Sequence, residues 1–183
     1  MQVEKTYLQG VFLITPDVFH DARGYFYEFF NLKKFEEQTG LQVQFVQDNI
    51  AKSDRGILRG LHFQTGDYAQ AKLVSVFKGK VLDVVVDLRK NSPTFGQYFS
   101  VILDEIKKQQ LFIPRGFAHA YLCLEDDTIF YYKVDNYYHK ESELGIRYDD
   151  PDLNIDWQFD LSGINLSEKD KNSVFLKDLM DKL

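Results

Sequence analysis

The sequence predicts an all-β fold of the closed or double-sheet kind, carried by one domain over residues 1–183. Aromatic residues make up 15% of the chain, with 16 Phe and 11 Tyr, and such side chains pack well on the pleated surface of a strand. About ten short segments rich in aromatic and β-branched residues are separated by turn residues. Helical patterns are few, so we expect two sheets with a few short peripheral helices.

The expected strands follow one another along most of the chain. They are the segments 11–16, 25–30, 43–47, 57–63, 72–77, 81–88, 98–103, 110–114, 120–124 and 129–134. Gly79 separates two of them, and a glycine can adopt the positive φ that a tight hairpin turn needs. Pro93 and Gly96 mark another reversal of the chain.

Two segments carry helix signals. Asn31 can cap a helix over residues 32–39, and Gly40 can end it. Ser167 opens a second segment, 167–180, with a capping residue and acids in the first turn. No fixed-period repeat and no Pro- or Ser-rich linker interrupts the chain, so we place no domain boundary.

Composition and charge exclude several classes of protein. A net charge of −6 opposes non-specific nucleic-acid binding. No segment approaches the roughly 20 apolar residues that cross a bilayer, and the first residues lack the apolar stretch of a signal peptide. The single Cys123 excludes an internal disulfide framework. We therefore expect a cytoplasmic protein without nucleic-acid or membrane partners.

Two of the four histidines lie in strand-like segments beside Arg and Gly. His62 follows Arg59 in LRGLHFQ, and His119 lies in PRGFAHAY. A single histidine in a strand is usually a packed, hydrogen-bonded core residue. Two histidines in such similar surroundings, on separate strands, indicate a shared site.

The segment 114–119 resembles the second motif of the cupin superfamily, in which its final histidine, here His119, binds a metal. The resemblance implies a cupin jelly roll. The first cupin motif normally supplies His-x-His followed by Glu, whereas this chain has His62, Gln64 and Lys72. An ammonium group near the site opposes a divalent cation. We therefore expect no bound metal, and a metal-dependent cupin remains an alternative.

Without a metal, His62 and Lys72 suit removal of a proton next to a carbonyl. Imidazole, with an unperturbed pKa of about 6.5, accepts a proton at neutral pH, and the developing enolate needs a preorganised positive donor. Epimerisation also needs a separate acid on the opposite face of the carbon. Tyr131 and Tyr132 point to opposite sides of their strand, so only one of them can face a barrel interior.

Eight segments, from about Val11 to Asp170, resemble the dTDP-4-dehydrorhamnose 3,5-epimerase family in sequence and in order. They are HDARGYFYEFF, VQDNIAKS, LRGLHFQ, QAKLV, DVVVDLRKNSPTFGQ, IPRGFAHA, YYKVDNYY and LSEKD. Among the departures, Ala120 and Tyr121 stand where many relatives carry Gly and Phe. We expect both to alter the packing around His119 without changing the chemistry.

The resemblance implies a role for each matched position. His62 matches the general base, Asp170 the carboxylate that orients it, Lys72 the enolate stabiliser and Tyr132 the acid. Further positions match contacts to the nucleotide sugar, with Tyr138 stacked on the thymine: Arg23, Glu28, Gln47, Asn49, Arg59, His119, Tyr138, Glu143 and Lys169. The guanidinium fork of arginine suits a diphosphate.

The resemblance also implies the reaction and the assembly. The expected reaction, part of dTDP-L-rhamnose biosynthesis, epimerises C3 and C5 of dTDP-4-dehydro-6-deoxy-D-glucose to give dTDP-4-dehydro-L-rhamnose, without a cofactor. The expected assembly is a homodimer in which the N-terminal strand region of one subunit contributes to the site of the other. Alternatives remain open: a single-carbon epimerase, a sugar 3,4-ketoisomerase, a metal-dependent cupin and a non-catalytic sugar-binding cupin.

Overall fold

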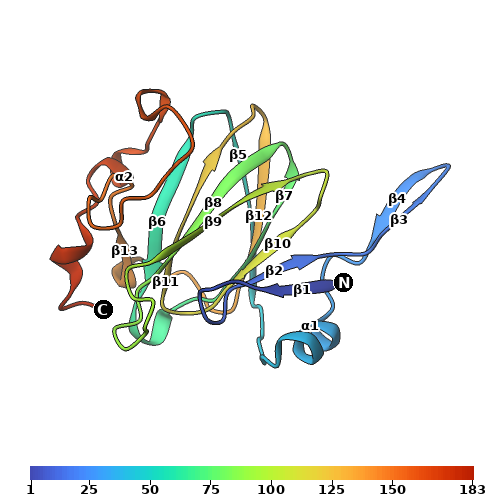
Figure 1. Ribbon diagram of the computed structural model, residues 1–183, viewed down its shortest axis with the longest axis horizontal. Helices are drawn as coiled ribbons and strands as arrows, with labels where there is room; N and C mark the ends of the chain where they lie inside the picture. Colours follow the sequence, from blue (N-terminus) through green and yellow to red (C-terminus); the bar gives the residue numbers. More distant parts are fainter.

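Two antiparallel β-sheets stacked face to face form the body of the computed structural model, which describes residues 1–183 (Figure 1). One sheet has the strand order β1 (Gln2–Lys5), β2 (Phe12–Thr15), β10 (Gln110–Ile113), β7 (Lys72–Lys78), β12 (Thr128–Val134) and β5 (Gln47–Ser53). The other has the order β13 (Glu143–Gly145), β6 (Leu58–Gln64), β11 (Phe117–Cys123), β8 (Lys80–Asp87) and β9 (Tyr98–Asp104). This sandwich, with its few short helices, confirms the predicted all-β fold.

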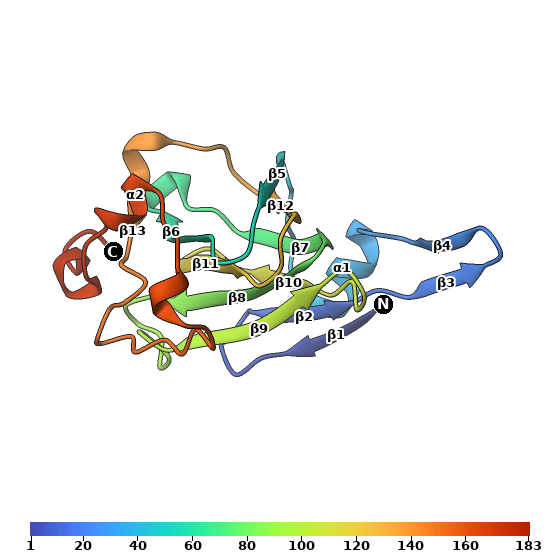
Figure 2. The ribbon, with the colours of Figure 1, turned by 90° about the horizontal axis from the view of Figure 1, so that it is seen from above.

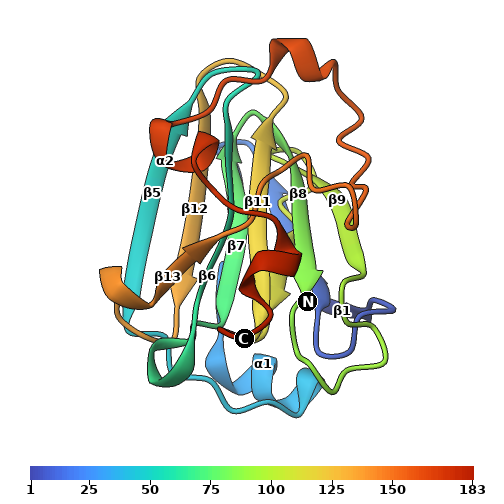
Figure 3. The same cartoon turned by 90° about the vertical axis from the view of Figure 1, so that its left-hand side faces the viewer.

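The strands β8 and β11 are buried on both faces, which explains their nearly continuous apolar sequences. Val81 and Val85 point into the core between the sheets, whereas Leu82 and Val84 point into a second core on the outer side. The C-terminal segment, orange to red in Figure 3, covers this outer side. The five-stranded sheet is therefore the middle layer of the molecule, and side chains on its inner face are shielded from solvent.

The first predicted helix is confirmed with both of its ends. Helix α1 (Leu32–Thr39) begins after Asn31, whose side chain accepts a hydrogen bond from the Lys34 amide at 3.1 Å. It ends at Gly40, which adopts a left-handed φ of 72°. Phe35 is the buried residue of this helix, and its ring packs edge-on against Phe112 of β10.

The second predicted helix is wrong beyond its first turn. Ser167 caps α2 (Glu168–Lys171) as expected, but the helix has only four residues. Val174 then forms a bridge with Ile146, and a short 3-10 turn follows over Leu176–Leu179. Leu176 and Leu179 are buried in the outer core, so tertiary packing overrides the helical pattern. No helix in the structure is long and apolar enough to pass through a membrane.

The predicted strand over 43–47 is also wrong, because pairing begins only at Gln47, opposite Val134 of β12. Val43 and Phe45 instead pack into the small core beneath α1. The strands β1, β3 (Val18–Asp21) and β13 escaped prediction because they are short and carry no alternating apolar pattern.

The strands β3 (Val18–Asp21) and β4 (Gly24–Tyr27) form a hairpin that projects from the body of the molecule (Figures 1 and 2). It is a separate two-stranded sheet, with Phe19, Tyr25 and Phe26 exposed. Isolated two-stranded hairpins are marginally stable in water, so this element lacks the packing that supports the rest of the fold.

Candidate active site

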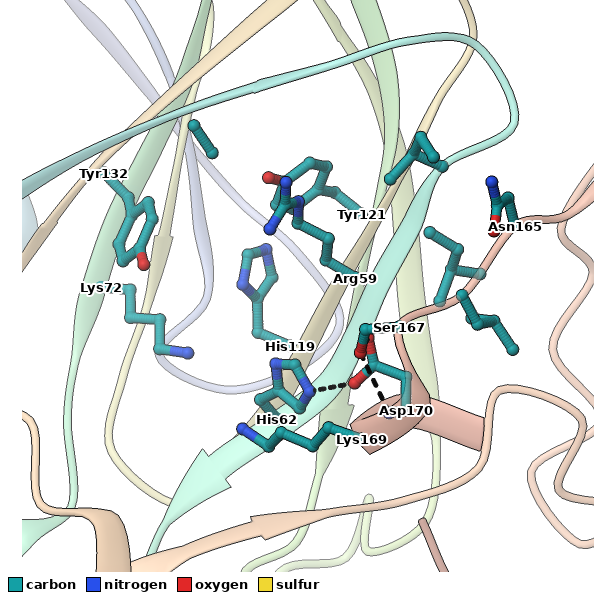
Figure 4. Close-up of a pocket in the computed structure, with 14 residues that line it drawn as sticks. Arg59, His62, Lys72, His119, Tyr121, Tyr132, Asn165, Ser167, Lys169 and Asp170 are labelled. Atoms are coloured by element: carbon teal, nitrogen blue, oxygen red, sulfur yellow. Dashed lines mark hydrogen bonds and ion pairs between the residues drawn. The ribbon is translucent and has the colours of Figure 1, made fainter. Parts of the chain in front are cut away.

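A cavity of about 530 Å³ lies between the two sheets, next to α2 (Figure 4). Strands of both sheets and the C-terminal segment line it. Seven of the residues predicted for the site are among its lining: Arg59, His62, Lys72, His119, Tyr132, Lys169 and Asp170. Three of these seven are cations, so an acidic protein contains a basic pocket.

His62 and Asp170 form a hydrogen-bonded pair at one side of this cavity. His62 lies on β6, and its Nε2 is 2.5 Å from Oδ1 of Asp170, which is buried. The Ser167 hydroxyl donates to the other oxygen of Asp170 at 2.8 Å. Burial alone would raise the pKa of Asp170, but the interactions with His62 and Ser167 outweigh it and lower that pKa. The carboxylate is thus held ionised, where it can fix the orientation of the His62 ring.

Lys72 enters the cavity from β7 in the opposite sheet, with no protein hydrogen bond to its amine (Figure 4). Burial lowers the pKa of Lys72 to about 8. The amine is therefore mostly protonated at neutral pH, although it lies in surroundings that disfavour charge. A buried ammonium group of this kind is stabilised strongly when a negative charge develops beside it.

Tyr132 lines the cavity from β12, and its neighbour Tyr131 lies on the other face of the same strand. Tyr131 packs outside the cavity, stacked on Phe77. Strand alternation therefore selects Tyr132 as the tyrosine that faces the interior. Burial raises the pKa of Tyr132, so the hydroxyl keeps its proton at neutral pH.

His119 lies directly opposite His62 in the pairing of β11 with β6. Its Nε2 is 2.9 Å from Oδ2 of Asp83, and burial lowers the pKa of His119. Gly60 allows the two strands this close approach, since a Cβ there would lie 2.5 Å from the His119 backbone oxygen. Sequence analysis missed Asp83, although a lone acid inside the apolar strand VLDVVV signals a buried polar contact.

The cavity rim contains a chain of polar contacts among three predicted residues. Lys169 lies 2.6 Å from Glu143, and the Tyr138 hydroxyl donates to the same carboxylate at 2.8 Å. Burial would raise the pKa of Glu143, but the contacts with Lys169 and Tyr138 lower it. Glu143 therefore stays ionised and links β13 to α2 beside the site.

Gln47 and Asn49 lie on β5 and contact each other at 2.8 Å. Asn49 is paired directly with Tyr132, and residues paired in this way share one face of the sheet. Both side chains therefore lie on the inner face, although neither belongs to the cavity lining described above.

The structure does not bring Arg23 and Glu28 to the cavity of their own chain. Arg23 lies on the projecting hairpin, where it pairs with Asp21 and is 89% exposed. Glu28 pairs with Lys34 of α1. Within one chain, these two predicted positions belong to a different part of the molecule.

The described chain contains no group of three or more His, Cys, Asp and Glu side chains arranged to hold a metal ion. In the cupin positions, His62 and His119 are each paired with a separate aspartate, Asp170 and Asp83. Lys72 lines the same cavity, and its charge would repel a divalent cation.

Comparison with known proteins identifies the family to which this chain belongs. A family model described as dTDP-4-dehydrorhamnose 3,5-epimerase matches residues 5–178. The enzyme of that name from Escherichia coli is 49% identical over 180 residues, covering 98% of this chain and 97% of the relative.

Solved structures of epimerases match this chain in fold as well as in sequence. The dTDP-4-dehydrorhamnose 3,5-epimerase of Elizabethkingia anophelis matches with a TM-score of 0.94 and 53% identity, covering 97% of both chains. The dTDP-6-deoxy-D-glucose-3,5-epimerase of Legionella pneumophila, in complex with dTDP-4-keto-L-rhamnose, matches with a TM-score of 0.93 and 45% identity, covering 96% of this chain and 93% of its own. A 3'-monoepimerase of Streptomyces bikiniensis, in complex with dTDP-quinovose, is 33% identical at a TM-score of 0.90, covering 97% of this chain and 89% of its own. The chain belongs to the dTDP-4-dehydrorhamnose 3,5-epimerase family.

Proposed function

We propose that this protein epimerises C3 and C5 of dTDP-4-dehydro-6-deoxy-D-glucose to give dTDP-4-dehydro-L-rhamnose. One observation carries the proposal: His62 and Tyr132 enter the same cavity from opposite sheets. A sugar ring held between the sheets meets a base on one face and an acid on the other. Inversion of a carbon centre requires this arrangement, because a base acting alone returns the proton to the face it came from.

The proposed reaction repeats one proton exchange at two carbons. His62, oriented by Asp170, removes the proton from C3 or C5, both of which are next to the C4 ketone. The electron pair moves onto the ketone oxygen, where the Lys72 ammonium stabilises the enolate. Tyr132 then gives its proton to the opposite face of the carbon. Before the second carbon reacts, His62 releases its proton to solvent and Tyr132 takes one up from solvent. Substrate and product have the same oxidation level, so the steps need no redox cofactor.

The charge distribution in the cavity supports the proposed roles of its tyrosine, lysine and arginine. Burial raises the pKa of Tyr132 and so keeps the proton that an acid must deliver. Lys72, with a pKa of about 8, can carry its positive charge next to the enolate at neutral pH. Arg59 lines the cavity without a carboxylate partner, which leaves its guanidinium available to the diphosphate.

The remaining predicted contacts belong to the same proposal. We assign His119 to the sugar, and Gln47 and Asn49 on the inner face of β5 to the nucleotide sugar. At the rim, Lys169, Glu143 and Tyr138 are assigned to the nucleotide, with the exposed Tyr138 ring available to stack on thymine.

For Arg23 and Glu28, we propose that they act in the site of a second subunit. The hairpin that carries the exposed Arg23 projects from the body of the molecule (Figure 1), which supports a homodimer in which the N-terminal strands of each subunit reach the other. Exposed aromatic side chains on the hairpin, Phe19, Tyr25 and Phe26, also favour contact with another protein surface.

Proton NMR of the substrate in deuterium oxide tests the reaction. We expect loss of both the C3 and C5 proton signals, together with a product that a reductase converts to the rhamnose nucleotide. Deuterium at one carbon alone would identify a single-carbon epimerase, as in the Streptomyces neighbour. No exchange at either carbon would contradict the proposal, and elemental analysis of unchelated protein would then separate a metal-dependent cupin from a binding module.

A further inference from the structure

Arg59, on β6, is held inside the cavity by one buried serine. Its Nε and Nη2 both donate to Oγ of Ser53, each at 3.1 Å. Ser53 is the last residue of β5 and is 8% exposed. These are the only side-chain hydrogen bonds from Arg59 to the protein, so the direction of the guanidinium depends on Ser53.

The hydroxyl of Tyr121 is buried in the same part of the cavity without a hydrogen-bond partner. Its ring is stacked on Phe130, with 3.8 Å between the centroids, and therefore cannot turn away. Burial raises the pKa of Tyr121, and the nearby Arg59 guanidinium and Ser53 hydroxyl partly oppose that rise. Figure 4 shows the Tyr121 hydroxyl beside the Arg59 guanidinium.

A count of hydrogen-bonding groups connects these residues. A serine hydroxyl has two acceptor sites and one donor, and Arg59 occupies both acceptor sites of Ser53. The Ser53 proton must then find an acceptor among the groups that face it, the Tyr121 oxygen and the Cys123 sulfur. Oxygen is the stronger acceptor, and an unpaired buried hydroxyl is costly. The structure has no hydrogen bond between Ser53 and Tyr121, so a small shift that lets Ser53 donate to the Tyr121 oxygen would satisfy both groups.

We propose that Ser53 and Tyr121 are positioning residues that hold the Arg59 guanidinium in line for the diphosphate of the nucleotide sugar. Two of the five N–H donors of Arg59 are engaged by Ser53, so three remain for the phosphate oxygens. The inference rests on the proposed function, because that function assigns Arg59 to the diphosphate. It adds two residues to the site that sequence analysis did not place there.

Calorimetric titration with dTDP and with thymidine tests this role, because only dTDP has phosphates for Arg59 to bind. For Ser53→Ala we expect dTDP affinity to fall about tenfold, with KM rising to match and kcat within about twofold. Tyr121→Phe should weaken dTDP about threefold, since Ser53 still accepts from Arg59. Thymidine affinity should stay the same in both variants, and Ser53→Thr, which keeps the hydroxyl, should restore dTDP binding.

The matched control is Ser75→Ala, which removes a buried serine hydroxyl outside the cavity, one that donates to the Gln109 carbonyl at 3.2 Å. Unchanged dTDP affinity in Ser53→Ala would overturn the inference, and so would an equal loss for dTDP and thymidine. If the unaltered protein binds no thymidine nucleotide and exchanges no substrate proton, the proposed function itself fails. If it does both while Ser53→Ala behaves like Ser75→Ala, only the positioning role fails.

Discussion

The cavity and the β3–β4 hairpin contrast in how their residues are held. In the cavity, side chains come from both sheets and from α2, and partners such as Asp170 are 3% exposed. On the hairpin, two strands pair only with each other, and Arg23 is 89% exposed. Family resemblance implied substrate contacts in both regions. A single chain brings His62, Lys72 and Tyr132 together in the cavity, whereas Arg23 can act in a site only if the hairpin reaches a second subunit, as proposed above.

Replacement of His62 by Ala should have the largest effect, because it removes the proposed base from the cavity. We expect kcat to fall about 10³-fold, within the range that general base catalysis contributes. Ser167 still donates to Asp170, so the fold should persist. Steady-state kinetics with circular dichroism checks both expectations, and substantial residual turnover would remove His62 from its role.

Tyr132→Phe should separate proton removal from inversion. With the acid missing and the base intact, we expect epimerisation to fall about 10²-fold, while solvent deuterium still enters on the original face. Tyr131→Phe is the matched control, since that tyrosine lies outside the cavity. NMR in deuterium oxide distinguishes exchange from inversion, and equal losses of both would argue against Tyr132 as the acid.

Arg23→Ala tests the hairpin half of the comparison. If Arg23 binds substrate in the partner's site, KM should rise about tenfold, as expected when a hydrogen bond to a charged group is lost. Thermal stability should hardly change, because the side chain is exposed. An unchanged KM would leave the hairpin without a role in substrate binding.

A mixing experiment sharpens this test without a new substitution. Refolding the Arg23→Ala and His62→Ala variants together would create mixed dimers. In such a dimer, one site combines the intact His62 of the Arg23→Ala subunit with the intact Arg23 of the His62→Ala subunit. At substrate concentrations near the KM of the unaltered protein, activity should exceed the sum of the two separate variants. Strict additivity would show that each site is built from a single chain.

The pH dependence of kcat/KM should show a smaller effect inside the cavity. In the proposed reaction Lys72 stabilises the enolate in its protonated form, which is present below its pKa of about 8 and is lost as the pH rises through that value. We therefore expect a decline of about threefold between pH 7.5 and 8.5. Lys72→Arg keeps the charge and should remove this decline from whatever activity remains. If kcat/KM of Lys72→Arg still falls in the same way over this pH range, the decline belongs to the titration of another group.

Asn31→Ala should have the smallest effect, at the base of the hairpin and far from the chemistry. The substitution removes the side-chain cap of α1, so we expect a loss of about 1 kcal/mol in unfolding free energy. Denaturant melts measure the loss, and kcat should not change. A fall in kcat would indicate that α1 and the hairpin are coupled to the cavity.

Several features followed from residue types alone. Asn31 and Gly40 marked the ends of α1, and alternation separated Tyr131 from Tyr132. The pairing of His62 with Asp170, 108 residues further along the chain, came instead from family resemblance. No local pattern could have indicated this contact, because the position of Asp170 in the sequence is equally typical of an ordinary acid in the first turn of a helix.

The sequence by itself determined the strand-rich fold and the first helix, because these depend on local composition and alternation. It also supplied His62 and Lys72 as candidates for the base and the cation, whereas Tyr132 as the acid came from family resemblance. Only the tertiary structure decided that β5 begins at Gln47 and that α2 ends after one turn. It alone also pairs Asp83 with His119 and Ser53 with Arg59, and places Tyr121 in the cavity lining. Those outcomes depend on long-range strand register and on burial between two sheets. Both arise from contacts between segments far apart in the chain, and no short stretch of sequence specifies them.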